Sequence, residues 1–270
     1  MSEELINKVL AEVVKKMGGD DPAPSAAPTP APAPTPAAGT LPAVTEFVGT
    51  NVLGDTIGMV IANVDPKLRA MMKLEKDFRS IGILGARTGA GPHIFAADEA
   101  VKATNSEILT IELPRDTKGG AGHGSLIIFG AEDVSDARRA VEVALGELDR
   151  TFGDVYGNDA GHLEFQYTAR ASYALNKAFG APIGKAFGIT VGAPAGIGVV
   201  LADTAVKAAT VDVIGYASPG GGTSYSNEVI SFLSGDSGAV RQAIIAAREV
   251  GIPLLGSLGA TPESTTTPYI

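Results

Sequence analysis

Two glycine-rich loops hold most of the residue types that could do chemistry. The first runs from Pro114 to Gly124 and carries Asp116, Lys118 and His123, while the second runs from Ser218 to Ser226. Glycine lets backbone segments approach closely, and the N–H and hydroxyl groups of such loops are hydrogen-bond donors. These loops could bind a small polar molecule in an enzyme, or they could line an opening through a packed protein layer.

Signatures of particular enzymes are weak. The tetrapeptide Gly235-Asp236-Ser237-Gly238 resembles the nucleophile region of trypsin-like proteases, but a catalytic triad also needs a His and an Asp in the right geometry. A strand end followed by a helix cap is the simpler interpretation. No Gly-Lys-Ser/Thr follows the glycine runs at 85–91 and 119–124, which argues against a Walker phosphate loop. We therefore predict no catalytic residue and no cofactor. The alternative is an enzyme that binds a small molecule with its glycine-rich loops.

Composition excludes several further classes. The chain has 270 residues, a net charge of −9, no cysteine and three histidines. An acidic protein lacks the basic stripe that binds nucleic acid. His93, His123 and His162 are too few and too scattered for a convincing zinc site, so we predict no metal. No run of 18 apolar residues could span a membrane, and the N-terminus lacks a signal-peptide pattern.

One seven-residue stretch occurs twice. Residues 97–103 read Ala-Asp-Glu-Ala-Val-Lys-Ala, and residues 202–208, which lie 105 positions later, read Ala-Asp-Thr-Ala-Val-Lys-Ala. This spacing is that of a small domain and exceeds the 20 to 50 residues of a solenoid repeat. The sequence therefore predicts a duplicated domain.

Hydrophobic patterning predicts the same order of elements in both halves. In the first half we expect strands at 57–62, 80–86, 107–113 and 125–129, and helices at 66–76, from Pro92, and from 133 or 135 to about 150. In the second half we expect strands at 183–193, 211–217, 228–233 and 254–258, and helices at 199–209 and 236–250. The shared unit is helix, strand, glycine-rich loop, strand, helix, which predicts an α+β fold.

The first 43 residues differ from the rest. Leu5, Ile6, Val9, Leu10 and Val13 recur at helical spacing, and eight prolines follow between positions 22 and 42. The Pro/Ala-rich segment forms no core and samples extended polyproline II conformations. Because a helix of about 15 residues is marginal alone in water, its apolar side needs a partner. We expect an amphipathic helix that docks another protein from a disordered linker, or, more simply, a terminus packed on its own domain.

Residues 199–250 resemble the bacterial microcompartment (BMC) shell domain. The resemblance is carried by Ala202–Ala208, Val213–Tyr216, the second glycine-rich loop and Gly235–Val240. The strand and helix that precede each unit, at 45–86 and 162–179, are similar to the circularly permuted tandem form. Four stretches also resemble the large shell proteins of propanediol-utilisation microcompartments, namely Thr45–Thr50, Ser80–His93, Pro114–Gly124 and Leu148–Tyr156.

This resemblance implies a structural protein of a microcompartment shell in the cytoplasm. It implies a homotrimer whose six domains imitate a hexamer, tile with other shell proteins and let small polyols such as 1,2-propanediol or glycerol pass. Lys102 and Lys207 match the family's edge lysine, which contacts the neighbouring particle. The loop residues that the resemblance assigns to openings are Asp116, Thr117, Lys118, Gly119, Gly120, His123, Ser218, Pro219, Gly220, Gly221, Gly222, Thr223 and Ser224.

The predicted architecture is α+β, with two tandem circularly permuted BMC domains. We expect the N-terminal helix at 1–18, the linker at 19–43, the first domain at 44–156 and the second at 157–270. Encapsulated enzymes are the expected partner of the N-terminal helix, and neither nucleic acid nor a membrane is expected to bind. Either loop could line the trimer axis, with the other lining an opening inside one subunit.

Overall fold

A computed structural model describes residues 44–74, 76–115, 123–222 and 226–270. The predicted N-terminal helix and linker lie outside these residues, as do loop positions Asp116, Thr117, Lys118, Gly119, Gly120, Thr223 and Ser224. Residues 44–270 belong to one compact unit, which contains both copies of the repeat.

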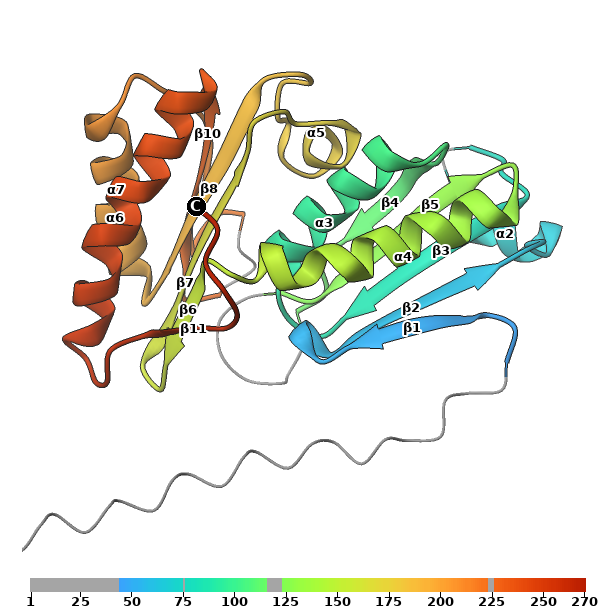
Figure 1. Cartoon of the computed structure of the whole chain (residues 1–270), viewed down its shortest axis with the longest axis horizontal. Helices are drawn as coiled ribbons and strands as arrows, with labels where there is room; N and C mark the ends of the chain where they lie inside the picture. Colours follow the sequence, from blue (N-terminus) through green and yellow to red (C-terminus); the bar gives the residue numbers. More distant parts are fainter. Residues whose placement is uncertain (1–43, 75, 116–122, 223–225) are drawn as a thin grey trace, which may run out of the picture. The chain divides into compact units, whose positions relative to one another are not determined.

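The first half forms a five-stranded antiparallel sheet with the order β1-β2-β3-β5-β4 (Figure 1). Its strands are β1 (Phe47–Asn51), β2 (Thr56–Ile61), β3 (Ser80–Ala86), β4 (Glu107–Glu112) and β5 (Ser125–Ala131). A short 3₁₀ turn, η1 (Leu53–Asp55), joins the first two strands, and helix α2 (Pro66–Met72) follows β2. Helices α3 (Ala90–Ala103) and α4 (Val134–Thr151) pack on each other and cover one face of this sheet.

The second half repeats this plan in a sheet with the order β11-β6-β7-β8-β10-β9. Its strands are β6 (Val155–Asn158), β7 (Gly161–Thr168), β8 (Ala186–Ala193), β9 (Asp212–Ala217), β10 (Val229–Gly235) and the short β11 (Glu263–Ser264). Helix α5 (Tyr173–Phe179) follows β7, and α6 (Ala195–Ala208) and α7 (Ser237–Gly256) cover one face of the sheet.

The two sheets confirm the predicted α+β duplication. The orders β1-β2-β3-β5-β4 and β6-β7-β8-β10-β9 are the same order in two copies, and β11 adds an edge strand to the second. In each copy a strand pair, a short helix and a third strand precede the helix–strand–strand–helix unit, which is the permuted arrangement. The predicted boundary between residues 156 and 157 lies inside β6, so we propose a boundary just before Val155.

Glycines in the central strands let the covering helices lie close to each sheet. A Cβ at Gly82 of β3 would lie 2.6 Å from the Ala137 carbonyl oxygen of α4, and a Cβ at Gly188 of β8 would lie 3.0 Å from Ile244 and Val240 of α7. A methyl group at Gly82 would collide with the backbone of α4, and one at Gly188 would require the side chains of Ile244 and Val240 to move. In both domains, therefore, a glycine in a central strand allows the covering helix to lie close to the sheet.

The predicted strand at 254–258 is wrong, because α7 continues to Gly256. The interior Pro253 lacks an N–H and predicts a helix end in isolation. However, Gly251 and Leu255 are buried on either side of it, and Leu255 belongs to the core of the second domain. Tertiary packing thus carries the helix past the proline. The patterning also placed the start of α6 at residue 199, one turn after the observed start at Ala195.

Candidate functional site

The repeated heptapeptide forms the last turns of α3 and α6, but its two copies have different surroundings. In α3 the carboxylate of Asp98 is buried, whereas the side chain of Asp203 in α6 is 57% exposed. Lys102 and Lys207 differ in the same sense, with side-chain exposures of 24% and 73%. The copies are therefore not equivalent within one chain.

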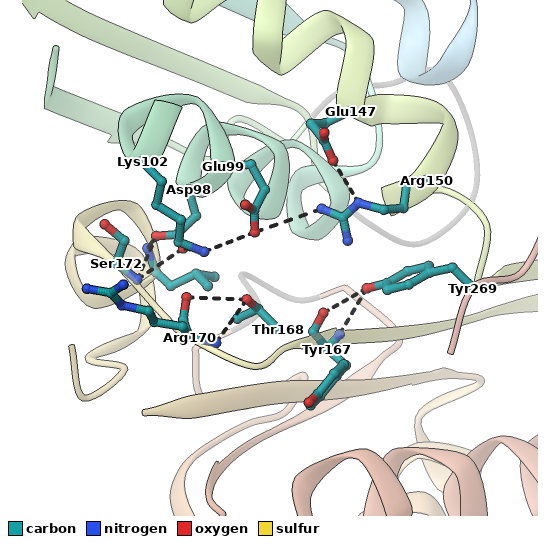
Figure 2. A network of polar contacts seen from close by, with 11 residues as sticks. Asp98, Glu99, Lys102, Glu147, Arg150, Tyr167, Thr168, Arg170, Ser172 and Tyr269 are labelled. Carbon is teal, nitrogen blue, oxygen red and sulfur yellow. Dashed lines mark hydrogen bonds and ion pairs between the residues drawn. The ribbon is translucent and has the colours of Figure 1, made fainter. Parts of the chain in front are cut away.

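Asp98 joins the two domains by capping helix α5 (Figure 2). Both carboxylate oxygens accept hydrogen bonds from the Ser172 N–H at 3.0 Å, and Oδ1 also accepts from the Leu175 N–H at 3.2 Å. Lys102 Nζ lies 2.9 Å from Asp98 Oδ2. Burial raises the pKa of Asp98, and the charge of Lys102 opposes this rise. A carboxylate at a helix N-terminus satisfies amides that have no partner inside the helix.

A second arm of this network reaches the C-terminal residues. Lys102 also pairs with Glu99, whose Oε1 lies 4.0 Å from Arg150 Nη2 (Figure 2). The Arg150 guanidinium lies 4.9 Å from the centre of the Tyr269 ring, and the Tyr269 hydroxyl donates to the Tyr167 carbonyl oxygen at 2.8 Å. Burial raises the pKa of Tyr269 to about 12, so this hydroxyl keeps its proton. Residues of α3, α4, β7 and the C-terminal segment are thereby tied together.

The described parts of the glycine-rich loops lie beside the domain junction. Ser218 and Gly221 exchange two backbone hydrogen bonds of 2.8 and 2.9 Å, and Gly222 has a φ of +93° that disfavours other residues. His123 lies near the end of the first loop, and its Nδ1 is 3.5 Å from Oε1 of Glu228, which follows the second loop. His123 and Gly222 line one cavity, so the structure brings residues of both predicted loops together.

Four titratable side chains meet at this junction: His123, His162, Glu164 and Glu228. His162 and Glu164 lie two positions apart on β7 and so point to the same side of the strand. His162 Nε2 lies 3.5 Å from Glu228 Oε2 and 3.7 Å from Glu164 Oε1. Among the described groups, none completes a hydrogen bond to His162 Nε2.

The environment separates the acidities of the two carboxyl groups. Burial raises the pKa of Glu164, with the charge of His162 opposing the rise. Burial would also raise the pKa of Glu228, but the two histidines beside it, His123 and His162, outweigh this effect and lower the pKa to about 2. Burial would lower the pKa of His162, yet the nearby carboxylates of Glu228 and Glu164 raise it. The Glu228 carboxylate is thus ionised at neutral pH, whereas the charge on Glu164 depends on the neighbouring His162.

Members of this cluster line two cavities. The first, of about 420 Å³, is lined by Glu164, Glu228 and His123 and by apolar side chains that include Phe179 and Phe232. The second, of about 610 Å³, is lined by Glu164 and His162 and by residues of both domains. Glu164 is a wall of both cavities. Neither carboxylate was among the residues predicted from the sequence. The polar positions 162, 164 and 166 nevertheless alternate with apolar ones in β7 and mark a buried polar face.

Among the residues that the structure describes, no catalytic triad surrounds the protease-like tetrapeptide. Ser237 is the first residue of α7, and its hydroxyl lies 2.5 Å from the Tyr167 hydroxyl rather than near a histidine ring nitrogen. Across the described ranges, no group of histidine and acidic side chains has the geometry of a metal site. No helix in the same part of the chain is long and apolar enough to cross a membrane.

The comparisons with known proteins agree with this architecture. The BMC domain family matches residues 80–158 and 186–260, which together make up more than half of the chain. The chain belongs to the BMC-domain family of bacterial microcompartment shell proteins.

Within that family the similarity is to PduB proteins. The chain is 63% identical over 269 residues to the bacterial microcompartment shell protein PduB of Salmonella typhimurium strain LT2, which covers 100% of this chain and 99% of the relative. It is 62% identical, with the same coverage, to the PduB of Citrobacter freundii. A crystal structure of a trimeric PduB superposes with a TM-score of 0.82 at 55% identity and covers 84% of this chain and 100% of that one.

Proposed function

We propose that three copies of this chain close into a ring whose six domains imitate a hexamer and tile a facet of a microcompartment shell. The observation that carries the proposal is an unequal burial of equivalent residues. Ile94 of α3 is fully buried, whereas Val199, its counterpart 105 positions later in α6, is 49% exposed. Ile108 of β4 is 8% exposed, and its counterpart Val213 of β9 is 54% exposed.

The burial in the first domain comes from helix α5. This helix packs on α3 and β4 within the same chain. Its counterpart in the first domain is α2, whose apolar residues Leu68 and Met71 are 49% and 78% exposed. Each chain therefore presents an uncovered α6–β9 face and an uncovered α2 face. If a second copy placed its α2 on this α6 as α5 sits on α3, both apolar surfaces would leave water.

A contact between two different faces is head-to-tail, and it closes only if the rotation completes a ring. The two domains of one chain already show the packing that successive domains would repeat. The PduB relative whose structure matches over 84% of this chain is described as trimeric. Three chains with two domains each complete a sixfold outline.

For the shell's solutes we propose small neutral polyols such as 1,2-propanediol or glycerol. The proposal is supported by the high identity to PduB proteins and by loops whose backbone N–H groups and hydroxyls match such solutes. The loop residues given above remain the proposed lining of openings. We further propose that the chain has no catalytic role, which is supported by the contact of the Ser237 hydroxyl with the Tyr167 hydroxyl instead of with a catalytic base. A separate proposal concerns the N-terminal helix, whose apolar residues would dock encapsulated enzymes: Leu5, Ile6, Val9, Leu10 and Val13.

Two variants test the head-to-tail ring. Val199→Asp spoils the α6 face and Met71→Asp spoils the α2 face, so each protein alone should run as a monomer while the unchanged chain runs as a trimer. A mixture of the two variants should give a 1:1 dimer, because each partner keeps the face that the other needs. The measurement is mass by light scattering at micromolar concentration, and Val134→Asp, at an exposed apolar position of α4, is the control that should remain trimeric.

Trimers of Val199→Asp, or a mixture that stays monomeric, would contradict the proposed contact. A monomeric unchanged chain would contradict the ring altogether.

A further inference from the structure

The C-terminal segment crosses from the second domain to the end of α4 in the first. After β11, the Thr266 hydroxyl donates a hydrogen bond to the carbonyl oxygen of Asp149 in α4. Gly153 makes room for this crossing, because a Cβ there would lie 2.1 Å from the Thr267 carbonyl oxygen. Residues 265–268 are partly or fully exposed, so little buried apolar surface holds this part of the segment in place.

A buried ion pair holds the backbone of the two residues that follow, Tyr269 and Ile270. Asp154 is fully buried, and its Oδ2 accepts hydrogen bonds from the N–H groups of Tyr269 and Ile270 at 2.9 and 3.1 Å. Arg248 of α7 donates to the Ile270 carbonyl oxygen at 2.9 Å and lies 2.6 Å from Asp154 Oδ1. Because Arg248 binds one carboxylate oxygen and the two amides bind the other, the charges would stay paired without the segment.

The side chains of the same two residues make separate contacts. The Tyr269 hydroxyl donates to the Tyr167 carbonyl oxygen at 2.8 Å and accepts from the Tyr167 N–H at 3.3 Å (Figure 2). The Arg150 guanidinium lies 4.9 Å from the centre of the Tyr269 ring, and Ile270 is buried in the core of the second domain. These contacts distinguish tyrosine from phenylalanine at the first position and favour an aliphatic side chain at the second.

We infer that Asp154, Arg248 and the Tyr167 backbone form a peptide-binding site for a tyrosine followed by an aliphatic residue. The chain fills this site with its own Tyr269-Ile270 and so ties the end of α4 to the second domain. Attachment through β11 raises the local concentration of the segment, which lets a few hydrogen bonds hold it. A short peptide of the same sequence should therefore bind once the chain's own segment is displaced.

A full-length variant with a vacated site provides the test. Tyr269→Pro removes the aromatic ring and the N–H that Asp154 accepts. The probe is the hexapeptide Thr-Thr-Thr-Pro-Tyr-Ile, which is the sequence of residues 265–270, with a fluorophore at its N-terminus. Fluorescence anisotropy should show saturable, sub-millimolar binding to the variant. The unchanged chain, whose site is filled, should bind the peptide about ten-fold or more weakly.

The peptide and the site each have a matched control. A peptide with Phe in place of Tyr should bind the Tyr269→Pro variant about three- to ten-fold more weakly, because it lacks the hydroxyl. Adding Asp154→Asn to that variant should weaken binding of the Tyr peptide about ten-fold or more, since a charged acceptor forms the stronger hydrogen bonds. Adding Asp159→Asn, at an exposed position, should leave binding unchanged.

Amide hydrogen exchange gives a second measurement if Tyr269→Pro fails to fold. In the unchanged chain, after correction for intrinsic rates, the amides of Tyr269 and Ile270 should exchange about ten-fold or more slowly than that of the exposed Thr267. Asp154→Asn should remove this difference. The inference would be overturned by a folded variant that does not bind the peptide, by equal binding of the Tyr and Phe peptides, by binding that Asp154→Asn leaves unaltered, or by unprotected Tyr269 and Ile270 amides.

Discussion

At the scale of single residues, identical sequence serves two purposes. Asp98 and Asp203 occupy the same position of the repeated heptapeptide, yet only Asp98 meets a helix N-terminus. The helix that corresponds to α5 needs no such cap, because α2 is capped by its own Asp65, which accepts from the amides of Lys67 and Leu68. Asp203 is therefore left to pair with Lys207 at 2.7 Å on the surface.

Replacing these two aspartates should separate the roles. Asp98→Ala leaves two amides of α5 and the Lys102 ammonium without their acceptor, so we expect a loss of about 2–3 kcal/mol in the free energy of unfolding. Asp203→Ala removes only an exposed ion pair and should stay within about 0.5 kcal/mol of the unchanged chain. Urea unfolding at fixed protein concentration measures both, and equal effects would show that Asp98 does not hold the junction.

At the scale of elements, glycine positions set the distance between helix and sheet. Gly82 lies in β3 beneath α4, where a Cβ would also approach Val141 to 2.8 Å. Gly146 lies in α4 itself, and a Cβ there would meet nothing within 4 Å. The same residue type is thus required at one position and dispensable at the other, within one helix–sheet contact.

Alanine at these glycines should have opposite effects. Gly82→Ala overpacks the contact with α4, and we expect a destabilisation of about 1–3 kcal/mol. Gly146→Ala adds a methyl group in open space and improves helix propensity, so a gain of about 0.5–1 kcal/mol is expected. Thermal unfolding of both variants provides the comparison. A neutral Gly82→Ala would mean that α4 can move away from β3 at little cost.

At the scale of the whole molecule, one chain supplies two of the six domains of the proposed ring. One junction is satisfied internally by α3 and α5, while the equivalent surfaces on α6 and α2 remain uncovered. Lys207 lies near the uncovered surface and its side chain is largely exposed, whereas Lys102 is held by Asp98 and Glu99. Of the two predicted edge lysines, Lys207 is thus the more exposed within one chain, and its contact with a neighbouring particle stays a proposal.

Lys207→Ala should therefore weaken the sheet formed by trimers without dissociating the trimers. Light scattering reports the trimer, and negative-stain electron microscopy of concentrated protein reports the sheet. Sheets unaffected by Lys207→Ala would mean that the repeated lysine reflects common ancestry alone.

Deletion of residues 1–42 is the matched comparison, because it should leave trimers and sheets intact but release encapsulated enzymes from purified shells. Cargo retained after the deletion would contradict the proposed docking role.

The sequence by itself determined the duplication, the α+β class and the family, because all three follow from local signals. The heptapeptide, the strand patterning and the glycine-rich loops can be recognised without knowing which residues meet. Many element limits were close for the same reason, although α2 ends at Met72 rather than at 76. The wrong strand at 254–258 arose where burial of Leu255 outweighed the local effect of Pro253.

Only the tertiary structure decided how the two copies differ. Asp98 and Asp203 have nearly the same sequence neighbours, so their burial depends on α5, which lies more than 70 residues away along the chain. The meeting of Glu164, Glu228 and the two histidines likewise joins residues from separate loops and a strand. Such contacts depend on long-range packing, which local patterns do not record.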